Sequence, residues 1–517
     1  MKKKTKSTGS SVDGWDISVT AVYLFFIFYM ILLYTSGYFV DWQELVVEPF
    51  FLMRGLKLYT DIGTHHTPLL TQFLGLLYKL VGTEVMVRKI LLVLVSAAAA
   101  FLTIRAAHRL AGKKAALFSV LLFIILWPFY GGRDFWFDTF LSFFYIFVFV
   151  LILKRKTPLW LALAGIIMGL SFLIKQNGAI VAAVVFLMLL AREKPFRSRL
   201  RGSLFFSAGF LVPVLITATW YAFRGQLADA YYWIIKYNLS GSYLKWALKP
   251  PPVSDLLRLL VAVSPLMVLL ALCVISRNRR KRISWEFRLA FYMGLGASLA
   301  VYPRWERFHV APSLPFLVIC LVLSFNILLM REDKRRENQR SNVARAMLSA
   351  WAVVVFLDIG LFFPPLLADR IIPGFSAHWP LRSYNAPSWY DESYWKYIHH
   401  MPRIGRRLNQ KTDRQDRIFV WGWLGSRIYL EADRLPAGTF YYALPWFAYL
   451  PRFREDLSIV FEKERPCFVI EARKRFQYPE TPTLNELGVN LKKHGYQRFK
   501  EWEDRYPEFR VWKLTHD

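Results

Sequence analysis

The sequence DWQELVVEPFFLMRGLKLYTDIGTHHTP, residues 41–68, decides the fold. It follows an apolar run at residues 18–38 that is long enough to span a membrane. Asp41 and Glu44 are three positions apart, so on a helix they share one face and could both face a cleft at the membrane surface. The same spacing suits a helix cap with a capping-box-like partner, which needs no function. The residues alone leave both interpretations of this pair open.

The composition is that of a membrane protein. Of the 517 residues, 55% are hydrophobic and 17% are aromatic, which is more than a soluble chain of this length normally contains. The formal net charge of +30 would also suit a nucleic-acid-binding protein. The basic clusters, however, lie in short connectors between apolar runs, at residues 2–6, 105–114, 154–156, 192–201, 277–288 and 331–345. This is the positive-inside pattern, so we expect a lipid bilayer and no nucleic acid as a partner.

About eleven apolar segments of roughly spanning length follow one another along the chain. They lie at residues 18–38, 88–108, 115–131, 138–154, 158–175, 178–192, 203–222, 255–275, 288–303, 311–330 and 346–368. A shorter run at residues 68–81 carries Gln72 and Lys79, and we assign it to the membrane surface as an interfacial amphipathic helix. If this run crossed the membrane, the basic connectors would alternate between the two sides. As a surface helix, it keeps them all cytoplasmic.

This topology predicts a mainly α polytopic protein of the inner or plasma membrane, with a retained signal anchor and a cytoplasmic N-terminus. The parts are a transmembrane domain at 1–369 with its first outer loop at 39–87, a linker at 370–390, and an extracytoplasmic α/β domain at 391–517. In that last domain we expect helices at 391–408 and 483–494 and strands at 417–421, 467–471 and 508–514. The placement of Cys273, Cys320 and Cys467 makes a disulfide framework improbable.

The second outer loop, GGRDFWFD at residues 131–138, ends on an acidic residue that opens an apolar helix. A carboxylate carried to the centre of a bilayer costs about 2.5–3.5 kcal/mol, so the retention of Asp138 beside a span hints at a use. The structural alternative is a helix cap, which Asp138 or Thr139 could supply.

Cations recur at two further places on the expected outer side. Lys175 lies in a tight turn between two spans, and the segment RWERFH at residues 304–309 precedes the tenth span. The positive-inside rule does not place charge there, which favours a function. Arg304 and Arg307 could instead reach lipid headgroups or pair with Glu306. The aromatic loop 230–252 could cover a sugar or lipid, or belong to an interfacial aromatic belt.

The first loop as a whole resembles the first outer loop of the GT-C glycosyltransferase superfamily, in its aminoarabinose transferase, protein O-mannosyltransferase and Rgt-like branches. The resemblance is carried by Asp41 after the first span, by the turn from Gly55 to Asp61, and by a proline-led helix that ends at Gly82. It extends to the acidic residue that opens the fourth span, the lysine at the outer end of the fifth, and the basic-aromatic turn at 304–309. Trp42 and the His65–His66 pair depart from the family pattern.

The resemblance implies a GT-C fold and an enzyme that moves a sugar, with inversion, from a polyprenyl-phosphate carrier to an acceptor hydroxyl on a lipid, glycan or protein. It implies Asp41 as the general base and Asp138 as a second acidic site residue, with Glu44 as a further candidate. The leaving group is a phosphate anion, which cations can stabilise. The residues expected to bind it are Lys175, Arg304, Arg307, His309 and His66. The residues expected to bind substrate are Tyr59, Asp61 and Arg133.

The sequence leaves a divalent metal ion open and disfavours two other classes of protein. A divalent metal is left open, with Asp41, Glu44, Asp61 and Asp138 as candidate oxygen ligands, while two adjacent histidines are a weak metal signal. No cofactor motif is present. A transporter or flippase of lipid-linked sugars would place its charges near the midplane, often in internal repeats, whereas here they gather at one surface. An envelope assembly protein would leave the charged first loop without a task.

Overall fold

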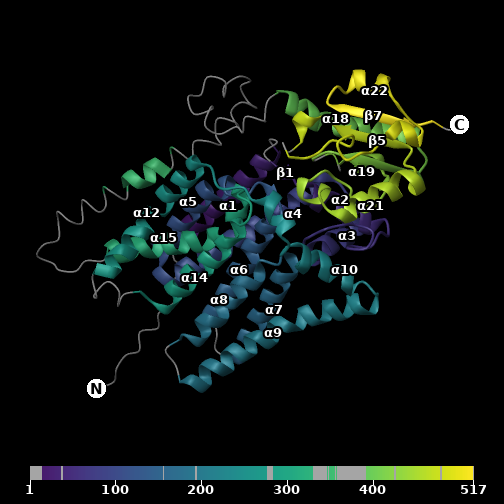
Figure 1. Cartoon of the computed structure of the whole chain (residues 1–517). Helices are drawn as coiled ribbons and strands as arrows, with labels where there is room; N and C mark the ends of the chain where they lie inside the picture. The colour runs from purple at the N-terminus through teal and green to yellow at the C-terminus, as the bar shows by residue number, and fades with distance from the viewer. Residues whose placement is uncertain are drawn as a thin grey trace, which may run out of the picture.

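A computed structural model describes residues 14–35, 39–154, 157–192, 195–275, 283–329, 349–355, 392–423, 427–477 and 480–515, with the single residues 346, 357 and 425. Its first part is a bundle of apolar helices, and a smaller α/β domain lies at one end of that bundle, beside the loops that follow the first helix (Figure 1). The long helices of the bundle are α1 (Gly14–Thr35), α4 (Val85–Ala111), α5 (Lys113–Phe129), α6 (Phe137–Lys154), α7 (Pro158–Ile174), α8 (Gly178–Leu190), α9 (Phe196–Phe223), α12 (Val253–Ile275), α14 (Trp285–Ser298) and α15 (Leu314–Leu329).

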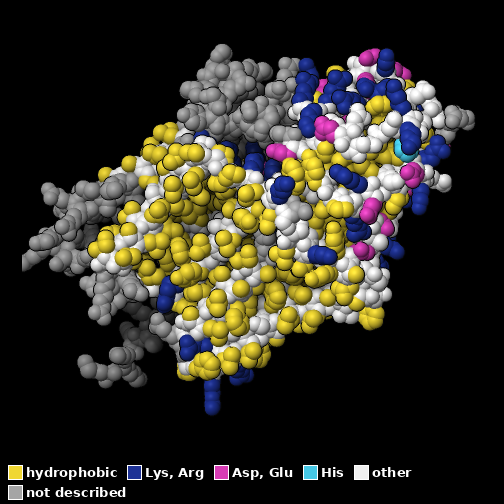
Figure 2. Space-filling model, viewed as in Figure 1, with side chains coloured by type: hydrophobic (Ala, Val, Ile, Leu, Met, Phe, Trp, Pro, Cys, Tyr) yellow, Lys and Arg dark blue, Asp and Glu magenta, His cyan; other side chains and the backbone are white. Residues whose placement is uncertain are grey.

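Within the described residues, six helical segments are long and apolar enough to cross a membrane. They are Ile17–Thr35, Val85–Ala111, Phe137–Lys154, Phe196–Phe223, Val253–Ile275 and Arg307–Leu328. Figure 2 shows hydrophobic side chains covering this face of the bundle, with Lys and Arg gathered over the α/β domain and again at the end of the bundle where α9 begins. Every segment expected to span up to residue 330 contains a helix. The eleventh, 346–368, lies largely outside the described residues, so the number of spans stays a prediction.

Helices α7 and α9 pack backbone to backbone, which sets the position of the α7 end. A Cβ atom added at Gly165 would lie 2.0 Å from the carbonyl oxygen of Phe206, and one added at Gly209 would lie 2.0 Å from that of Ala162. Only glycine allows this approach, and small residues at close helix contacts are typical of membrane bundles. The contact holds the α7 end, from which Lys175 follows directly.

The first and second outer loops are joined by a short parallel ladder. Strand β1 (Val40–Asp41) pairs with β2 (Asp134–Phe135). After β1, helix α2 (Gln43–Met53) is almost entirely buried, and α3 (Leu69–Val81) packs against it through the Tyr78 hydroxyl, which donates to the Leu45 carbonyl at 3.2 Å. The opposite face of α3 is exposed and apolar, with Leu80 at 72%. This is the amphipathic helix expected at 68–81, and its position at the membrane surface stays a prediction.

The loop between α9 and α12 is built from short helices: α10 (Leu227–Tyr231), the π-helix η1 (Tyr232–Tyr237) and α11 (Gly241–Ala247). Trp233 and Tyr237 of this loop are buried. Tyr237 donates to the carbonyl of Trp446, in the α/β domain, at 3.2 Å. The aromatic residues of the loop therefore pack into the junction between the bundle and the α/β domain.

The C-terminal domain is a five-stranded mixed sheet in the order β4-β3-β5-β7-β6, covered by helices. Its strands are β3 (Arg417–Trp421), β4 (Leu435–Pro436), β5 (Phe468–Ala472), β6 (Tyr496–Arg498) and β7 (Phe509–Leu514). Its longer helices are α18 (Glu392–Lys411), α19 (Arg427–Ala432), α20 (Pro445–Ala448), α21 (Pro451–Ile459) and α22 (Lys500–Arg505). Strands β3, β4 and β5 run parallel, so the connections that follow them leave the sheet at one edge. That edge faces the first loop, because the Gly63 amide donates to the carbonyl of Thr439, just beyond β4, at 3.0 Å.

One expected element of this domain is wrong. Residues 483–494 form turns and the short 3-10 helix η9 (Leu491–His494) in place of an α-helix. Gly488 adopts a φ of +78° in the middle of the segment, which a helix does not tolerate, and Gly495 with a φ of +83° ends η9. The strands expected at 417–421, 467–471 and 508–514 are present, displaced by at most one residue.

Candidate active site

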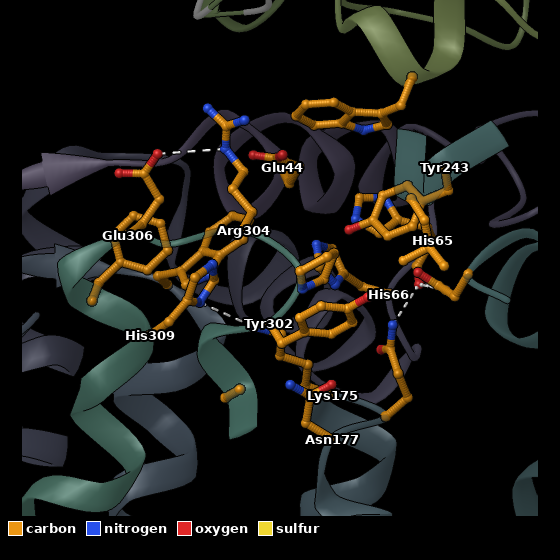
Figure 3. A pocket seen from close by; sticks show the side chains of 18 of the residues that line it. Glu44, His65, His66, Lys175, Asn177, Tyr243, Tyr302, Arg304, Glu306 and His309 are labelled. Atoms are coloured by element: carbon orange, nitrogen blue, oxygen red, sulfur yellow. Dashed lines mark hydrogen bonds and ion pairs between the residues drawn. The ribbon is translucent and has the colours of Figure 1, made fainter. Parts of the chain in front are cut away.

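A cavity of about 490 Å³ opens between the bundle and the C-terminal domain. Its walls come from α2, from the segment before α3, from the turn between α7 and α8, from the loop after η1, from the segment before α15, and from the C-terminal domain. Figure 3 shows Lys175 and Glu44 on opposite sides of this space, with Arg304, His65 and His66 around it. The sequence-predicted residues that line it are Glu44, His66, Lys175, Arg304 and His309.

The Lys175 ammonium is held by a buried carboxylate behind the wall. Its Nζ lies 2.6 Å from Asp138 Oδ2 and 3.4 Å from His309 Nδ1, and His309 Nδ1 lies 2.7 Å from the same Asp138 oxygen. Asp138 is fully buried at the start of α6, and its second oxygen has no hydrogen-bond partner in the part of the chain that the structure describes. A carboxylate in this position orients a cation for an anion on the other side of it. Asp138 therefore contacts the cavity through Lys175 and His309.

Arg304 forms the second cationic wall. Its Nε lies 3.4 Å from Glu306 Oε1, and its guanidinium lies over the Trp446 ring at 5.4 Å. Lys249 braces the same segment, since its Nζ lies 2.8 Å from Glu306 Oε1 and its backbone bonds to Pro303 and Trp305. The arginine is thus held by an acidic and an aromatic partner while it lines the cavity.

Glu44 is the first-loop carboxylate that lines the cavity. The Tyr442 hydroxyl donates to its Oε1 at 3.1 Å, while Oε2 is buried and has no hydrogen-bond partner among the residues that the structure describes. Burial raises the pKa of Glu44 to about 7, and the hydrogen bond from Tyr442 opposes that rise. A carboxyl group with a pKa near neutrality can both accept and release a proton.

Asp41 is engaged elsewhere. Its two oxygens accept from Nε and Nη2 of Arg88 at 3.1 and 3.0 Å, and this pair is almost completely shielded from solvent. Asp41 is the last residue of β1 and pairs with Phe135 of β2. It is not among the residues that line the cavity. The structure thus places Asp41 beside the cavity in an ion pair, and its role as a base stays a prediction.

The two histidines of the first loop lie side by side, with ring centroids 4.1 Å apart. His66 also packs on Phe137 at 4.3 Å. Burial lowers the pKa of His65 to about 3 and lowers that of His66 well below its usual value. Both rings are therefore neutral at pH 7, and neither ring nitrogen of His66 has a hydrogen-bond partner among the described residues.

The other four predicted site residues do not line the cavity, and each has a polar partner of its own. Arg307 forms a two-pronged ion pair with Asp255, at 2.9 Å from Nη2 to Oδ1. The hydroxyl of Tyr59 is buried and donates to the His66 carbonyl at 2.8 Å, so it shapes the loop. Asp61 accepts from the Lys57 amide at 2.8 Å. Arg133 lies 3.8 Å from Asp134. Burial raises the pKa of Asp134 to about 6.

Several cavity residues were not predicted as site residues. They are Trp42, Trp136, Asn177, Asn238, Tyr243, Tyr302, Trp423 and Trp446. Aromatic side chains in the outer loops were visible in the sequence but equally suited an interfacial belt. Trp423 and Trp446 belong to the C-terminal domain, and nothing in the sequence indicates that this domain closes the cavity. Among the residues that the structure describes, no three His, Cys, Asp or Glu side chains lie together as a metal-ligand set.

Residues 65–223 match the family model described as dolichyl-phosphate-mannose-protein mannosyltransferase. The structure is similar to ArnT from Cupriavidus metallidurans bound to undecaprenyl phosphate, with a TM-score of 0.56 and 13% identity over 97% of this chain and 98% of that one. It is also similar to the oligosaccharyltransferase AglB from Archaeoglobus fulgidus in complex with an inhibitory peptide and a dolichol-phosphate, with a TM-score of 0.47 and 12% identity over 94% and 73% of the two chains. No curated protein matches the sequence.

Proposed function

We propose that this chain, which has the GT-C glycosyltransferase fold, is an integral membrane enzyme that transfers a sugar from a polyprenyl-phosphate carrier to an acceptor hydroxyl on a lipid, glycan or protein. The observation that carries the proposal is the pairing, across one cavity, of two cations with a titratable carboxylate. Lys175 and Arg304 line one part of the wall, and Glu44 lies across from Lys175 (Figure 3). ArnT, which has the same fold, was crystallised with undecaprenyl phosphate, and this supports a lipid phosphate as the ligand of the cations.

The chemistry is a single displacement. The acceptor oxygen attacks the anomeric carbon, a first-loop carboxylate takes the proton of the acceptor, and the phosphate leaves with the electron pair of the broken bond. Lys175 and Arg304 then stabilise the charge that develops on the phosphate, in a cavity where water is scarce and such contacts are strong. One displacement inverts the configuration at the anomeric carbon. The family resemblance assigns the proton to Asp41.

The supporting residues act through these groups. Asp138 holds Lys175, and His309 bridges the two. The contact that His66 makes to the donor phosphate is a hydrogen bond from a neutral ring, because burial lowers its pKa. Arg307 acts at a distance by fixing the segment before α15 to Asp255. Tyr59, Asp61 and Arg133 shape the outer loops around the substrates.

The proposal is tested with the purified protein in lipid nanodiscs, supplied with radiolabelled sugars on undecaprenyl phosphate and with membrane extract as the source of acceptors. We expect the label to move from the carrier to a second species. Because Lys175 stabilises the leaving group, Lys175→Met should lower kcat by about 100-fold. The matched control is Lys513→Met, which removes an exposed lysine of β7 and should retain activity.

Two outcomes contradict the proposal. A wild-type protein that transfers no sugar from any polyprenyl-phosphate donor excludes the transferase. A protein that moves the labelled donor across a proteoliposome membrane without changing it is a flippase. Asp41→Asn, assayed alongside, shows whether the base is Asp41, because unchanged transfer removes it from that role.

A further inference from the structure

Two buried carboxylates on α2 are each held by a tyrosine of the C-terminal domain. Glu44 and Glu48 are four positions apart and so lie on one face of α2. The Tyr442 hydroxyl donates to Glu44 Oε1 at 3.1 Å, and the Tyr441 hydroxyl donates to Glu48 Oε1 at 2.6 Å. Two consecutive tyrosines of the C-terminal domain thus hold two acids that are one helical turn apart on α2.

Two ionised carboxylates at Glu44 and Glu48 would repel each other strongly, unless one of them carries a proton. Glu48 is 0% exposed and Glu44 is 7% exposed, and no Lys or Arg among the described residues forms an ion pair with either. Two carboxylates so close in a site of low dielectric do not both ionise near neutral pH. Hydrogen bonds from Tyr441 and Thr71, the latter at 3.4 Å, complete the surroundings of Glu48.

The two acids differ in what they face. Glu48 has partners on both oxygens and does not line the cavity. Glu44 lines the cavity, and its Oε2 is buried and unpartnered. A desolvated and unpaired carboxylate oxygen on a residue that lines a cavity is a candidate proton acceptor.

We propose that Glu44 is the general base of the transfer, and that Tyr442 together with the Tyr441–Glu48 pair positions it and sets its basicity. The inference rests on the proposed function and deepens it. In the step itself, the acceptor O–H proton passes to Glu44 Oε2 while the acceptor oxygen bonds to the anomeric carbon. The bond from that carbon to the phosphate oxygen breaks, and its electron pair leaves with the phosphate. The C-terminal domain is then part of the catalytic apparatus.

The pH at which Glu44 works follows from its neighbours. Burial raises its pKa to about 7, and burial raises the pKa of Glu48 to about 8, with the charge of Glu44 adding to that rise. The two carboxyl groups therefore titrate as a coupled pair that retains a proton near neutral pH. The titratable and charged groups around Glu44 are Glu48 on its own helix, Tyr441 and Tyr442 on the C-terminal domain, and His65, His66, Lys175, Tyr243, Tyr302, Arg304, Glu306 and His309 across the cavity.

The test is the pH dependence of kcat/KM for sugar transfer by the full-length protein in nanodiscs. We expect the wild type to lose activity as the pH falls through about 7, where Glu44 becomes protonated. Tyr442→Phe removes a hydrogen bond that favours the ionised carboxylate, so this acid limb should move up by about one pH unit. Tyr496→Phe is the matched control, because it removes the hydroxyl of a buried tyrosine that donates to the Pro466 carbonyl away from the cavity.

Glu44→Gln and Glu44→Asp keep the inference falsifiable if Tyr442→Phe does not fold. Glu44→Gln should lower kcat by about 100-fold or more and abolish the acid limb, whereas Glu44→Asp should keep the limb. Asp41→Asn should keep it as well. An acid limb that is unchanged in Glu44→Gln, or that disappears in Asp41→Asn, overturns the inference and leaves the transferase intact. If the acid limb of the pH profile does not move in Tyr442→Phe, Tyr442 has only a structural role, and the inference that it positions Glu44 is overturned. A wild type without transferase activity overturns both.

Discussion

Arg88, near the start of α4, donates two hydrogen bonds to the carboxylate of Asp41, beside the pairing of β1 with β2. Both side chains are shielded from solvent, with 1% of Arg88 and 8% of Asp41 exposed. Removing one partner of such a pair leaves a buried charge without compensation, which costs about 3–5 kcal/mol. The pair therefore ties the first outer loop to the bundle, whatever part Asp41 takes in chemistry.

We expect Asp41→Asn to lower the thermal unfolding temperature of the purified protein by several degrees, because the Arg88 guanidinium loses its counter-charge. The measurement is intrinsic fluorescence against temperature in detergent. Glu431→Gln is the control, since Glu431 forms a partly exposed ion pair with Arg427 at 3.6 Å, and ion pairs in contact with solvent contribute less than shielded ones. An unfolding temperature equal to that of the wild type would show that Asp41 is not needed to neutralise Arg88.

At the scale of residues, charge in an unexpected place was the informative signal. Lys175, Arg304 and His309 were predicted from their positions on the outer side, and the structure brings them to one cavity. Glu48 gave no such signal, because its neighbours in sequence suggest only an apolar helix with one acidic residue. Its importance arises from Tyr441, which lies 393 positions away in the sequence.

Helix α2 and the loop that carries Tyr441 and Tyr442 form the element that joins the two parts of the molecule. The junction is extended by the ion pair between Arg54 and Asp433 and by the bond from Gly63 to Thr439. Most of these contacts are polar and buried, so their strength depends on the protonation of the acids within them.

We expect the stability of this junction to fall as the pH rises. Glu44 and Glu48 have folded-state pKa values of about 7 and about 8, above the usual 4.5. A group whose pKa is raised by folding stabilises the folded state below its unfolded pKa and loses that contribution as the pH rises through the folded value. The unfolding temperature should therefore decline between about pH 5 and pH 9.

Glu48→Gln, which cannot ionise, should flatten this decline, while Glu431→Gln should leave it unchanged. The readout is the unfolding temperature measured across that pH range. Equal slopes in wild type and Glu48→Gln would mean that Glu48 already carries its charge in the folded protein.

Helices and strands with a clear period were predictable, because local patterning determines them. The strand at 417–421 was placed to the residue. The helix expected at 483–494 was wrong because Gly488 takes a positive φ, a requirement that a pattern of apolar residues does not reveal. The sequence predicted only an aromatic loop between α9 and α12, where the structure has short helices. Their apolar residues are buried against another domain, and the sequence does not reveal that contact.

The molecule as a whole is an integral membrane protein whose fold matches that of ArnT, so the expected GT-C fold is confirmed. Its orientation follows, as a proposal, from charge. Arg197, Arg199 and Arg201 lie at the start of α9, at the end of the bundle away from the C-terminal domain (Figures 1 and 2). The positive-inside rule places that end in the cytoplasm and the C-terminal domain outside.

Single cysteines test this orientation in intact cells. Lys492 and Arg197 are both exposed, and each is replaced by cysteine in turn. A membrane-impermeant maleimide should label Lys492→Cys directly and Arg197→Cys only after the membrane is permeabilised. The wild type is the control, because Cys273 and Cys320 are buried and Cys467 is half-buried. Labelling in the reverse order would invert the topology and exclude a cavity on the outer face.

The cavity draws its walls from distant parts of the chain, since Glu44 lies near the beginning and Trp446 lies in the C-terminal domain. Lys175 and Arg304 are therefore synthesised well before the C-terminal residues that complete the cavity wall. The cavity is complete only after the C-terminal domain has been synthesised and has packed against the first loop.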